Sequence, residues 1–331
     1  MKFEELIKDV KNGKPILILD DEKREGEGDL CVAAQKATHQ SINFMAAHGR
    51  GIVCMPITRK RSRELNLPLM VQNDQNTEKE RCKFTVSIDA REHTTTGVSA
   101  FDRAATIKKV MDDGAKPEDF RRPGHIFPLI AEDGGVFVRS GHTEGSIDLA
   151  RLAGLKPAAV ICEVMNDDGT MAKGQQLTAF AKKHGIKITT IEAIKKQRVL
   201  KEKIIEEIAN VNLPTAHGSF RLRAYKNKIT GFEELVIYKA PLKDNCLVRI
   251  HSECFTSEVL GSLRCDCNDQ LQTSMSLINK RGGMIIYLRQ EGRSLGLKNK
   301  LRSYELQDRG KDTIQANAHL DLPIDAREYY A

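Results

Sequence analysis

The chain has 331 residues, a formal net charge of +7 and 40% hydrophobic residues, and its length predicts two domains rather than one core. No apolar run is long enough to cross a bilayer, and the acidic N-terminus, with Glu4 and Glu5, lacks the apolar segment of a signal peptide. We therefore expect a cytoplasmic protein with no membrane partner. The lysines and arginines are dispersed with little aromatic interleaving, which disfavours a nucleic acid polymer and suits small anionic substrates such as phosphates.

An acidic stretch follows the first predicted strand. Apolar residues at helical spacing over residues 3–10 predict a helix, and the apolar run 15–19 predicts a buried strand. Residues 20–29 then hold six carboxylates, with Gly26 and Gly28 allowing close approach of a ligand to the backbone. Carboxylates this close repel one another unless a cation joins them, and Mg²⁺ binds such oxygens. The stretch predicts a divalent-metal site, the alternative being a solvated charged turn.

Apolar runs alternate with polar turns through the rest of the first two-thirds of the chain. Cys54 lies in an apolar run and is predicted to be a core residue. Residues 58–81 are polar and are predicted to be irregular. Two prolines and a glycine within residues 121–128 predict a shaped loop outside regular structure. The expected strands are 51–55, 83–89, 158–164 and 187–191, and the expected helices are 42–48, one beginning near Asp102, and 174–184.

Several polar residues of this region are candidates for chemistry. The hydroxyl-rich residues 94–99 can cap the helix that follows or hold a phosphate. Residues 139–146 combine a cation, an imidazole, hydroxyls and a carboxylate in one turn. There His142 is a candidate metal ligand or base, although a lone histidine is usually structural. Glu163 interrupts an apolar strand, and a carboxylate in that position needs a partner or a function.

The sequence changes character near residue 200. Residues 192–210 are charged, contain no glycine or proline, and are predicted to be a helical linker. The expected elements beyond it are a β-meander of strands 218–225, 234–239 and 246–250, a helix near 268–281 and a strand at 284–288. The pattern predicts an α/β (α+β) protein with two domains, 1–200 and 201–331.

Three cysteines give the clearest indication of a metal site in the sequence. Cys254, Cys265 and Cys267 have the spacing C-x10-C-x-C, and three thiolates with an open fourth position are typical of a catalytic zinc site. The alternatives are a closed site that recruits Cys246, or no metal. Residues 249–253 and 289–293 flank the cysteines with cations and hydrogen-bonding groups, a combination that suits a polyphosphate nucleotide.

The chain resembles the bifunctional riboflavin-biosynthesis family that joins 3,4-dihydroxy-2-butanone 4-phosphate synthase to GTP cyclohydrolase II. The first half of the resemblance covers residues 1–200 and implies a mixed α/β homodimer. It implies Mg²⁺- or Mn²⁺-dependent conversion of D-ribulose 5-phosphate to L-3,4-dihydroxy-2-butanone 4-phosphate and formate. The motifs that carry it are Asp20–Asp29, Thr95–Ser99, Arg122–His125, Gly141–Glu144 and Asn166–Ala172.

The synthase resemblance implies roles for individual residues. Glu25 and His142 match the family's ligands for the divalent metal. His125 and Glu163 match its essential, catalytic polar positions. The metal ligands and Glu163 are implied to contact ribulose 5-phosphate together with Arg24, Asp29, Arg139, Ser140, Gly141 and Thr143.

The cyclohydrolase resemblance runs from about Val211. The three cysteines match the family's zinc ligands, and zinc-bound water would open the imidazole ring of GTP and release formate. Tyr304 matches a catalytic tyrosine, Asp325 the proton acceptor, and Arg327 the nucleophile toward the α-phosphate. The implied GTP contacts are Arg249, Ile250, His251, Ser252, Glu253, Gln270, Glu291, Gly292, Arg293 and Thr313.

The family's domain continues past the point at which this sequence stops. The sequence ends four residues after Arg327, so we expect the second domain to lack its final elements and to turn over GTP very slowly, with Asp325 and Arg327 displaced. Two alternatives stay open. Both activities operate in a longer gene product of which this is a fragment, or the second half is a non-catalytic zinc- and nucleotide-binding module that regulates or dimerises the synthase.

Overall fold

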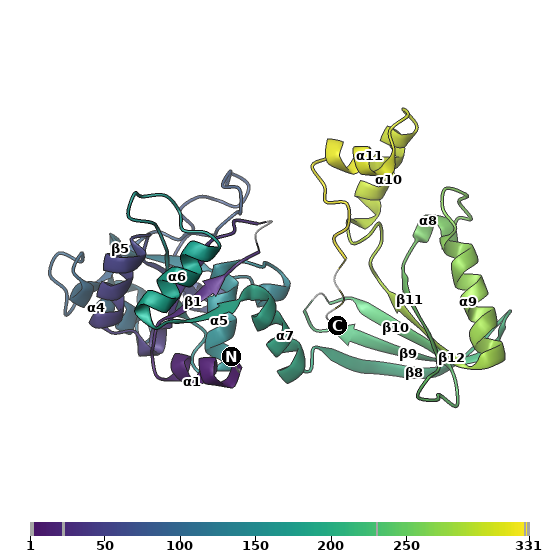
Figure 1. Ribbon diagram of the computed structural model, residues 1–331, viewed down its shortest axis with the longest axis horizontal. Coiled ribbons are helices and arrows are strands. Elements are labelled where there is room, and N and C mark those ends of the chain that lie inside the picture. Colours follow the sequence, from purple (N-terminus) through teal and green to yellow (C-terminus); the bar gives the residue numbers. More distant parts are fainter. Residues whose placement is uncertain (1–2, 22–23, 230, 328, 330–331) are drawn as a thin grey trace. The chain divides into compact units, whose positions relative to one another are not determined.

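The computed structural model describes residues 3–21, 24–229, 231–327 and 329, and the chain divides into two compact units, Met1–Glu202 and Lys203–Ala331 (Figure 1). Glu22 and Lys23 of the acidic stretch, and the last two residues of the sequence, lie outside the described residues. Of the helices that the structure describes, none is both long enough and apolar enough to span a membrane.

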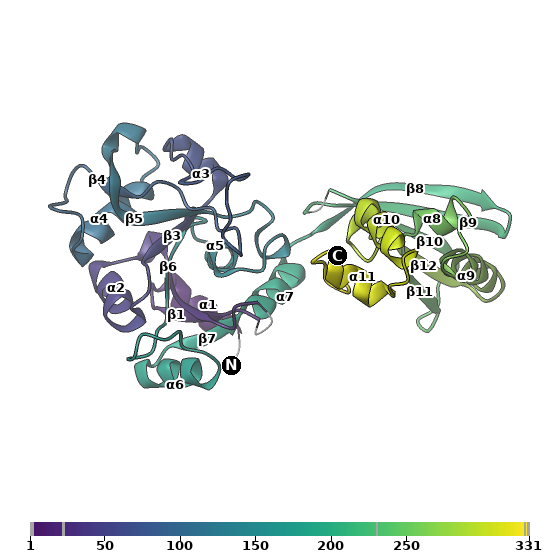
Figure 2. The same ribbon diagram turned by 90° about the horizontal axis from the view of Figure 1, so that it is seen from above.

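The first unit is built on a mixed seven-stranded sheet, which confirms the predicted mixed α/β fold. Figure 2 shows this sheet, with every strand labelled except β2 (Gly28–Ala33). The strands, in order from one edge of the sheet to the other, are β4 (Ile88–Ala90), β5 (Phe120–Ile130), β3 (Cys54–Ile57), β6 (Ala159–Glu163), β2, β1 (Ile16–Leu19) and β7 (Lys187–Thr190). β3 pairs parallel with β5 and β1 with β7, and the remaining pairs are antiparallel.

Helices cover both faces of this sheet, which explains why its inner strands read as continuous apolar runs. One core includes residues of α2, α4 and α6 with the side chains of Leu30 and Val32, and the other includes residues of α1, α5 and α7 with Cys31 and Ala33. Cys54 belongs to the second core, as predicted. The helices are α1 (Phe3–Lys11), α2 (His39–Phe44), α3 (Arg59–Glu64), α4 (Ala100–Val110), α5 (His142–Leu152), α6 (Gln175–His184) and α7 (Ile191–Lys201).

A buried ion pair ties α7 to α5. Arg198 Nη1 donates to Asp148 Oδ2 at 2.8 Å and to the carbonyl of Gly134 at 2.8 Å. The Asp148 side chain is fully buried and that of Arg198 is 7% exposed. The same carboxylate oxygen accepts the Val136 amide at 2.8 Å. The pair therefore also holds the turn that precedes α5.

The second unit is a five-stranded sheet with α9 against one face. The strands in sheet order are β11 (Leu247–Ser252), β12 (Gly283–Leu288), β10 (Glu233–Lys239), β9 (Gly218–Asn227) and β8 (Ile205–Thr215). The helices are α8 (Phe255–Glu258), α9 (Cys267–Arg281), α10 (Gly296–Gln307) and α11 (Thr313–His319). Phe220, Ile278 and Ile285 are buried between α9 and the sheet.

Five predictions of local structure were wrong. The strand expected at residues 83–89 is regular only at its end, in β4, because Phe84 and Thr85 make only isolated bridges to Leu129 and Leu69. Residues 121–128 lie within β5, although the pairing of Ile88 with Ile126 and of Asp89 with Arg121 leaves the four residues between as a bulge that accommodates Pro123. The 192–210 helix stops at Lys201, because the later residues form β8, an edge strand whose residues are mostly exposed.

The other two concern connectivity and a missed helix. The 246–250 strand does not continue the meander, because β11 pairs in parallel with β12 at the far edge of the sheet. The supposedly irregular stretch 58–81 begins with α3, whose N-cap Thr58 accepts a hydrogen bond from the amide of Arg61.

Candidate active sites

The acidic stretch forms the connection between β1 and β2 and is organised by one arginine. Arg24 Nη1 donates to Asp20 Oδ2 at 2.8 Å and to Glu25 Oε2 at 2.6 Å, and its Nε lies 2.8 Å from Glu80 Oε2. The other oxygen of Asp20 accepts the amide of Glu27 at 2.9 Å. Asp20, Arg24, Glu25 and Glu27 are therefore joined in a partly buried, hydrogen-bonded array.

His142 approaches this array from the first residue of α5. Its Nδ1 lies 3.5 Å from Asp29 Oδ1 and 3.9 Å from Glu25 Oε2. The potential ligand atoms of Asp20, Glu25 and His142 all lie within 4.8 Å of one another. The two predicted metal ligands are thus neighbours, and Asp20 joins them as a third candidate ligand. Asp29 belongs to β2 rather than to the loop, opposite Ile18 of β1.

The carboxylates of this cluster are crowded together, and the histidine beside them carries no positive charge near pH 7. Burial raises the pKa of Glu25 although Arg24 acts in the opposite direction, and burial with the carboxylates nearby raises the pKa of Asp29 well above its usual value. Burial lowers the pKa of His142 to about 4, so the imidazole is neutral near pH 7. A neutral imidazole beside crowded carboxylates is a donor set that fits a divalent cation such as Mg²⁺ or Mn²⁺.

Glu163 lies beside this cluster at the end of β6. It pairs across the sheet with Asp29. Its Oε2 accepts the amide of Ile52 at 2.8 Å, so this carboxylate in an apolar strand has a partner. Because Gly51 contacts Glu163, a Cβ at position 51 would lie only 2.8 Å from the Cβ and the backbone nitrogen of Glu163. Gly51 is therefore needed for the position of Glu163.

His125 lies at the same end of the sheet but two strands away. Cys54 of β3 pairs with Phe127 of the parallel strand β5 and with Ile161 of the antiparallel strand β6. His125 precedes Phe127 by two residues and Glu163 follows Ile161 by two residues, so both lie toward the same end of the sheet. Strand spacing of about 4.8 Å puts their backbones about 10 Å apart. His125 Nδ1 lies 2.7 Å from Asp89 Oδ2, and its amide donates to Asp89 Oδ1 at 2.9 Å.

Arg139 and the residues that follow it form the other side of the cluster. Arg139 Nη1 donates to Glu144 Oε2 at 2.7 Å, and its Nε donates to the carbonyl of Glu80. Glu80 therefore contacts both Arg24 and Arg139. Gly141, at the N-cap, and Thr143 are buried at the start of α5, where free helix amides favour an anion, and Ser140 Oγ donates to a backbone carbonyl.

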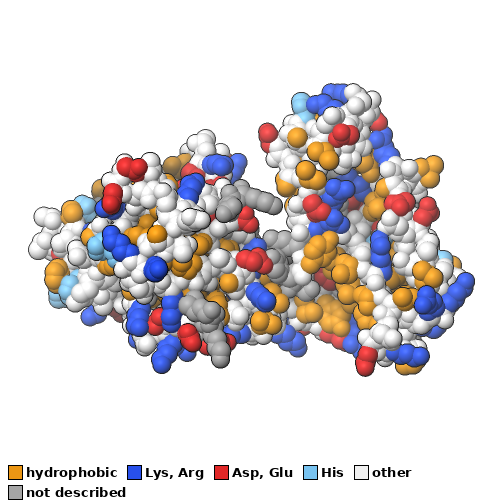
Figure 3. Space-filling model, viewed as in Figure 1, with side chains coloured by type: hydrophobic (Ala, Val, Ile, Leu, Met, Phe, Trp, Pro, Cys, Tyr) orange, Lys and Arg blue, Asp and Glu red, His pale blue; other side chains and the backbone are white. Residues whose placement is uncertain are grey.

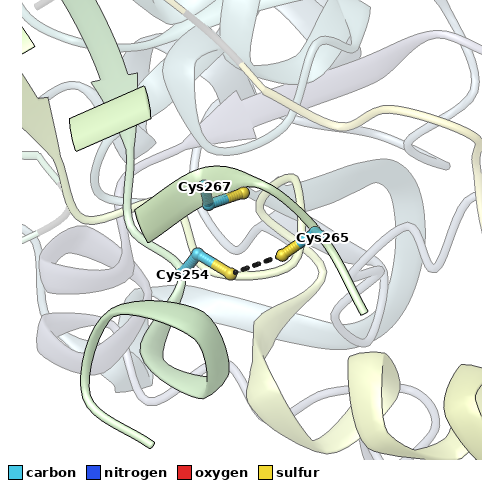
Figure 4. A group of neighbouring side chains, drawn as sticks. All are labelled: Cys254, Cys265 and Cys267. Atoms are coloured by element: carbon cyan, nitrogen blue, oxygen red, sulfur yellow. Dashed lines mark hydrogen bonds between the residues drawn. The ribbon is translucent and has the colours of Figure 1, made fainter. Parts of the chain in front are cut away.

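The three predicted zinc ligands meet in the second unit. Cys254, Cys265 and Cys267 have Sγ atoms within 4.8 Å of one another, as Figure 4 shows. The Sγ atoms of Cys254 and Cys265 are 3.5 Å apart, close to the ~3.8 Å expected between two sulfurs at 2.3 Å from a tetrahedral zinc. All eight cysteines are free thiols. The group fits a three-thiolate zinc site.

A hollow of about 310 Å³ opens beside Cys267. The residues that line it include most of the predicted GTP contacts of β11 and the arginine near the end of the chain. They are Arg249, Ile250, His251, Ser252, Cys267, Gln270, Arg327 and Tyr329. Asp325 Oδ1 accepts Arg327 Nε at 2.9 Å, and this ion pair lowers the pKa of Asp325 to about 2. The two catalytic candidates near the end of the chain are thus paired with each other, and Arg327 lines the hollow.

Other predicted GTP residues lie outside this lining. Glu253 accepts Arg289 Nε at 3.0 Å, and Glu291 accepts the amide of Phe255 at 2.6 Å. Gly292 and Arg293 have left-handed backbone conformations in the turn before α10. Thr313 is the exposed first residue of α11. Tyr304 lies 3.3 Å from the Thr256 hydroxyl, on the side of α10 that faces the cysteine turn.

Three functional candidates were missed from the sequence, Glu80, Asp89 and Lys300, and Asp20 was included only as part of the acidic stretch. Asp89 is the one with a usable signal, because it ends the alternating run 83–89 as a charged residue at a buried position. Lys300 donates to Cys254 Sγ at 3.0 Å. Glu80 and Lys300 lie in polar segments whose neighbours in space cannot be inferred from spacing.

The two units have the architecture of a two-domain α/β enzyme, and each carries a cluster of potential metal ligands. Residues 4–197 match the family 3,4-dihydroxy-2-butanone 4-phosphate synthase, and residues 206–331 match GTP cyclohydrolase II. The chain belongs to the family of bifunctional riboflavin biosynthesis proteins, which carry both enzyme domains. The synthases of this family act on ribulose 5-phosphate and the cyclohydrolases on GTP.

Relatives of this kind match along nearly the whole chain. The riboflavin biosynthesis protein RibBA of Aquifex aeolicus (strain VF5) is 49% identical over 332 residues, covering 98% of this chain and 81% of the relative. The probable chloroplastic bifunctional protein RIBA 2 of Oryza sativa subsp. japonica is 48% identical over 329 residues, covering 98% of this chain and 60% of the relative.

Two solved structures are similar. RibBX, described as a two-domain 3,4-dihydroxy-2-butanone 4-phosphate synthase from A. baumannii, is 40% identical with a TM-score of 0.74, covering 87% of this chain and 81% of that one. A 3,4-dihydroxy-2-butanone 4-phosphate synthase in complex with two magnesium ions is 39% identical with a TM-score of 0.57, covering 61% of this chain and 98% of that one. Divalent-metal use by the synthase domain follows from this likeness.

Proposed function

We propose that the first unit converts D-ribulose 5-phosphate at the cluster around Arg24 and His142. Glu25 and His142, with Asp20, would hold Mg²⁺ or Mn²⁺. The observation that carries this proposal is the meeting of three metal-binding side chains within 4.8 Å, between two arginines bridged by Glu80. The substrate contacts proposed are Arg24, Glu25, Asp29, Arg139, Ser140, Gly141, His142, Thr143 and Glu163.

The chain's own groups suit the proton transfers that this reaction needs. A bound divalent cation would polarise a carbonyl of the sugar phosphate and stabilise an enediolate. Asp29, whose raised pKa favours the protonated form, can hold a proton on its carboxyl group beside Glu163. His125, oriented through Nδ1 by Asp89, leaves Nε2 to exchange protons with the substrate.

We further propose that the second unit binds Zn²⁺ through Cys254, Cys265 and Cys267 and opens the imidazole ring of GTP in the adjoining hollow. The zinc would supply an activated water when bound. Arg249 and Arg327 would pair with the polyphosphate, and Tyr304, Asp325 and Arg327 would be the catalytic residues. The GTP contacts proposed are Arg249, Ile250, His251, Ser252, Glu253, Gln270, Glu291, Gly292, Arg293 and Thr313.

Formate release tests both proposals on one preparation, with ribulose 5-phosphate and GTP supplied separately. We expect the first reaction to require Mg²⁺ or Mn²⁺ and the second to require zinc. Removal of magnesium should stop only the first reaction. Formate from neither substrate by fully metallated, folded protein would contradict both assignments.

A non-catalytic second unit is the alternative function. It is favoured by the likeness to RibBX, a two-domain protein described by its synthase activity. Such a unit would bind zinc and GTP without releasing formate. Binding of a labelled GTP analogue measured beside formate release separates the two functions, since binding without turnover supports the module.

We also propose a cytoplasmic homodimer. The sheet face of the second unit opposite α9 supports it, because Val236, Tyr238, Met284 and Ile286 line a hollow of about 360 Å³ there. Figure 3 shows hydrophobic side chains gathered over the strands of this unit. A molar mass of two chains by light scattering would support the dimer, and a single chain at micromolar concentration would contradict it.

A further inference from the structure

Lys300 lies against the thiol cluster, and neither the sequence motifs nor the proposed reaction gives it a role. It projects from α10, and its Nζ donates to Cys254 Sγ at 3.0 Å and to Glu291 Oε1 at 2.7 Å. The side chain is only 13% exposed. A buried ammonium group needs charged or hydrogen-bonding partners, and the Glu291 carboxylate and the Cys254 sulfur supply them.

Glu291 completes a bridge over the turn that carries Cys254. Its Oε2 accepts the amide of Phe255 at 2.6 Å, while its Oε1 accepts Lys300. The residue after the thiol is thus fixed through Glu291, and the thiol itself through Lys300. The carboxylate is 12% exposed and fully engaged. The Cys254 sulfur is therefore held directly by Lys300, and the backbone next to it is held by Glu291.

Charge explains why an ammonium group is useful at this position. Three thiolates and one Zn²⁺ have a net charge of minus one, whereas three free thiols are neutral. A nearby positive charge therefore stabilises the zinc-loaded state more than the zinc-free state. A hydrogen bond to sulfur also reduces the electron density that the thiolate gives to the metal, as outer-shell groups do at other metal sites.

We propose that Lys300 is a positioning residue for the zinc centre, which orients Cys254 and offsets the excess negative charge of the three thiolates. This inference rests on the proposed three-cysteine zinc site. It assigns Glu291 to the support of that centre through Lys300 and the Phe255 amide, in addition to any contact with GTP.

Zinc affinity measured by competition with a chromophoric chelator tests the role directly. We expect Lys300→Met to bind zinc roughly tenfold more weakly than the unaltered chain. Lys300→Arg should recover most of the affinity, because a guanidinium can donate to the sulfur. Lys298→Met is the matched control, since Lys298 is an exposed lysine two residues earlier on α10 that has no ion pair or hydrogen bond through its side chain to the residues that the structure describes. It should bind zinc normally.

Cobalt substitution separates positioning from a loss of folding. Loss of the hydrogen bond should move the thiolate-to-cobalt absorption band of Lys300→Met to longer wavelength, which a general loss of stability would not do. Equal zinc affinity and an unmoved band in Lys300→Met would overturn the inference. Failure of the unaltered chain to bind zinc would instead overturn the proposed zinc site.

Discussion

Gly51→Ala tests how strictly the synthase site depends on the position of Glu163. The new Cβ would lie 2.8 Å from both the Cβ and the backbone nitrogen of Glu163. Carbon atoms in contact prefer about 3.5–4.0 Å, so the two segments must separate by about 1 Å. Part of the obstruction is backbone, so rotation of the side chain alone cannot relieve it.

The expected effect is larger on catalysis than on folding. A displacement of about 1 Å of a catalytic group can lower the rate roughly a hundredfold. Overpacking of this kind costs about 1–3 kcal/mol of stability. We therefore expect a roughly hundredfold lower kcat for formate release from ribulose 5-phosphate, with unchanged zinc binding by the second unit as an internal reference.

Gly114→Ala is the control for this variant. A Cβ at position 114 would approach only Asp112 Oδ1, at an ordinary 3.5 Å. It should therefore leave formate release and zinc binding unchanged. A Gly51→Ala protein that turns over ribulose 5-phosphate normally would refute the reasoning, because it would show either that Glu163 tolerates displacement or that it has no catalytic role.

Three further expectations concern the two sites. Glu25→Ala and His142→Ala should each abolish turnover of ribulose 5-phosphate and leave that of GTP intact; substantial formate release by either variant would count against the metal cluster. Elemental analysis should find about one zinc per chain, lost in Cys265→Ser but retained in Cys246→Ser, and equal loss in both would indicate a four-cysteine site. Asp89→Asn should lower kcat for ribulose 5-phosphate at least tenfold with little change in KM, since it disturbs the partner of His125 Nδ1; an unaltered kcat would assign Asp89 a purely structural role.

Features contained within one short segment were predictable from the sequence. The strands of the first unit are buried on both faces, so their apolar runs were visible, and the three cysteines lie within one turn-and-helix segment. The acidic stretch and His142 were identified through local motifs. Their meeting was implied only by the family resemblance.

Features that depend on partners distant in the sequence were not predictable. β8 is an edge strand with mostly exposed residues, so its composition matches that of a linker. Glu80 lies in a polar stretch without periodicity, yet it contacts Arg24 and Arg139. The bulge in β5 arises from its register with β4, which no pattern in the segment itself reveals.

The ion pair between Asp148 and Arg198 determines where the synthase can be separated from the cyclohydrolase. The family match of the first unit stops at residue 197, but Arg198, one of two arginines that pair with the fully buried Asp148, is the very next residue. A buried carboxylate left with no partner typically costs about 3–5 kcal/mol, and loss of Arg198 would cost part of that, because Arg151 Nη1 still donates to Asp148 Oδ1 at 3.1 Å. Arg198 also pairs with Glu202 at 2.6 Å. An independently stable synthase must therefore extend through Glu202, so the sequence boundary and the energetic boundary of this half of the protein differ by five residues.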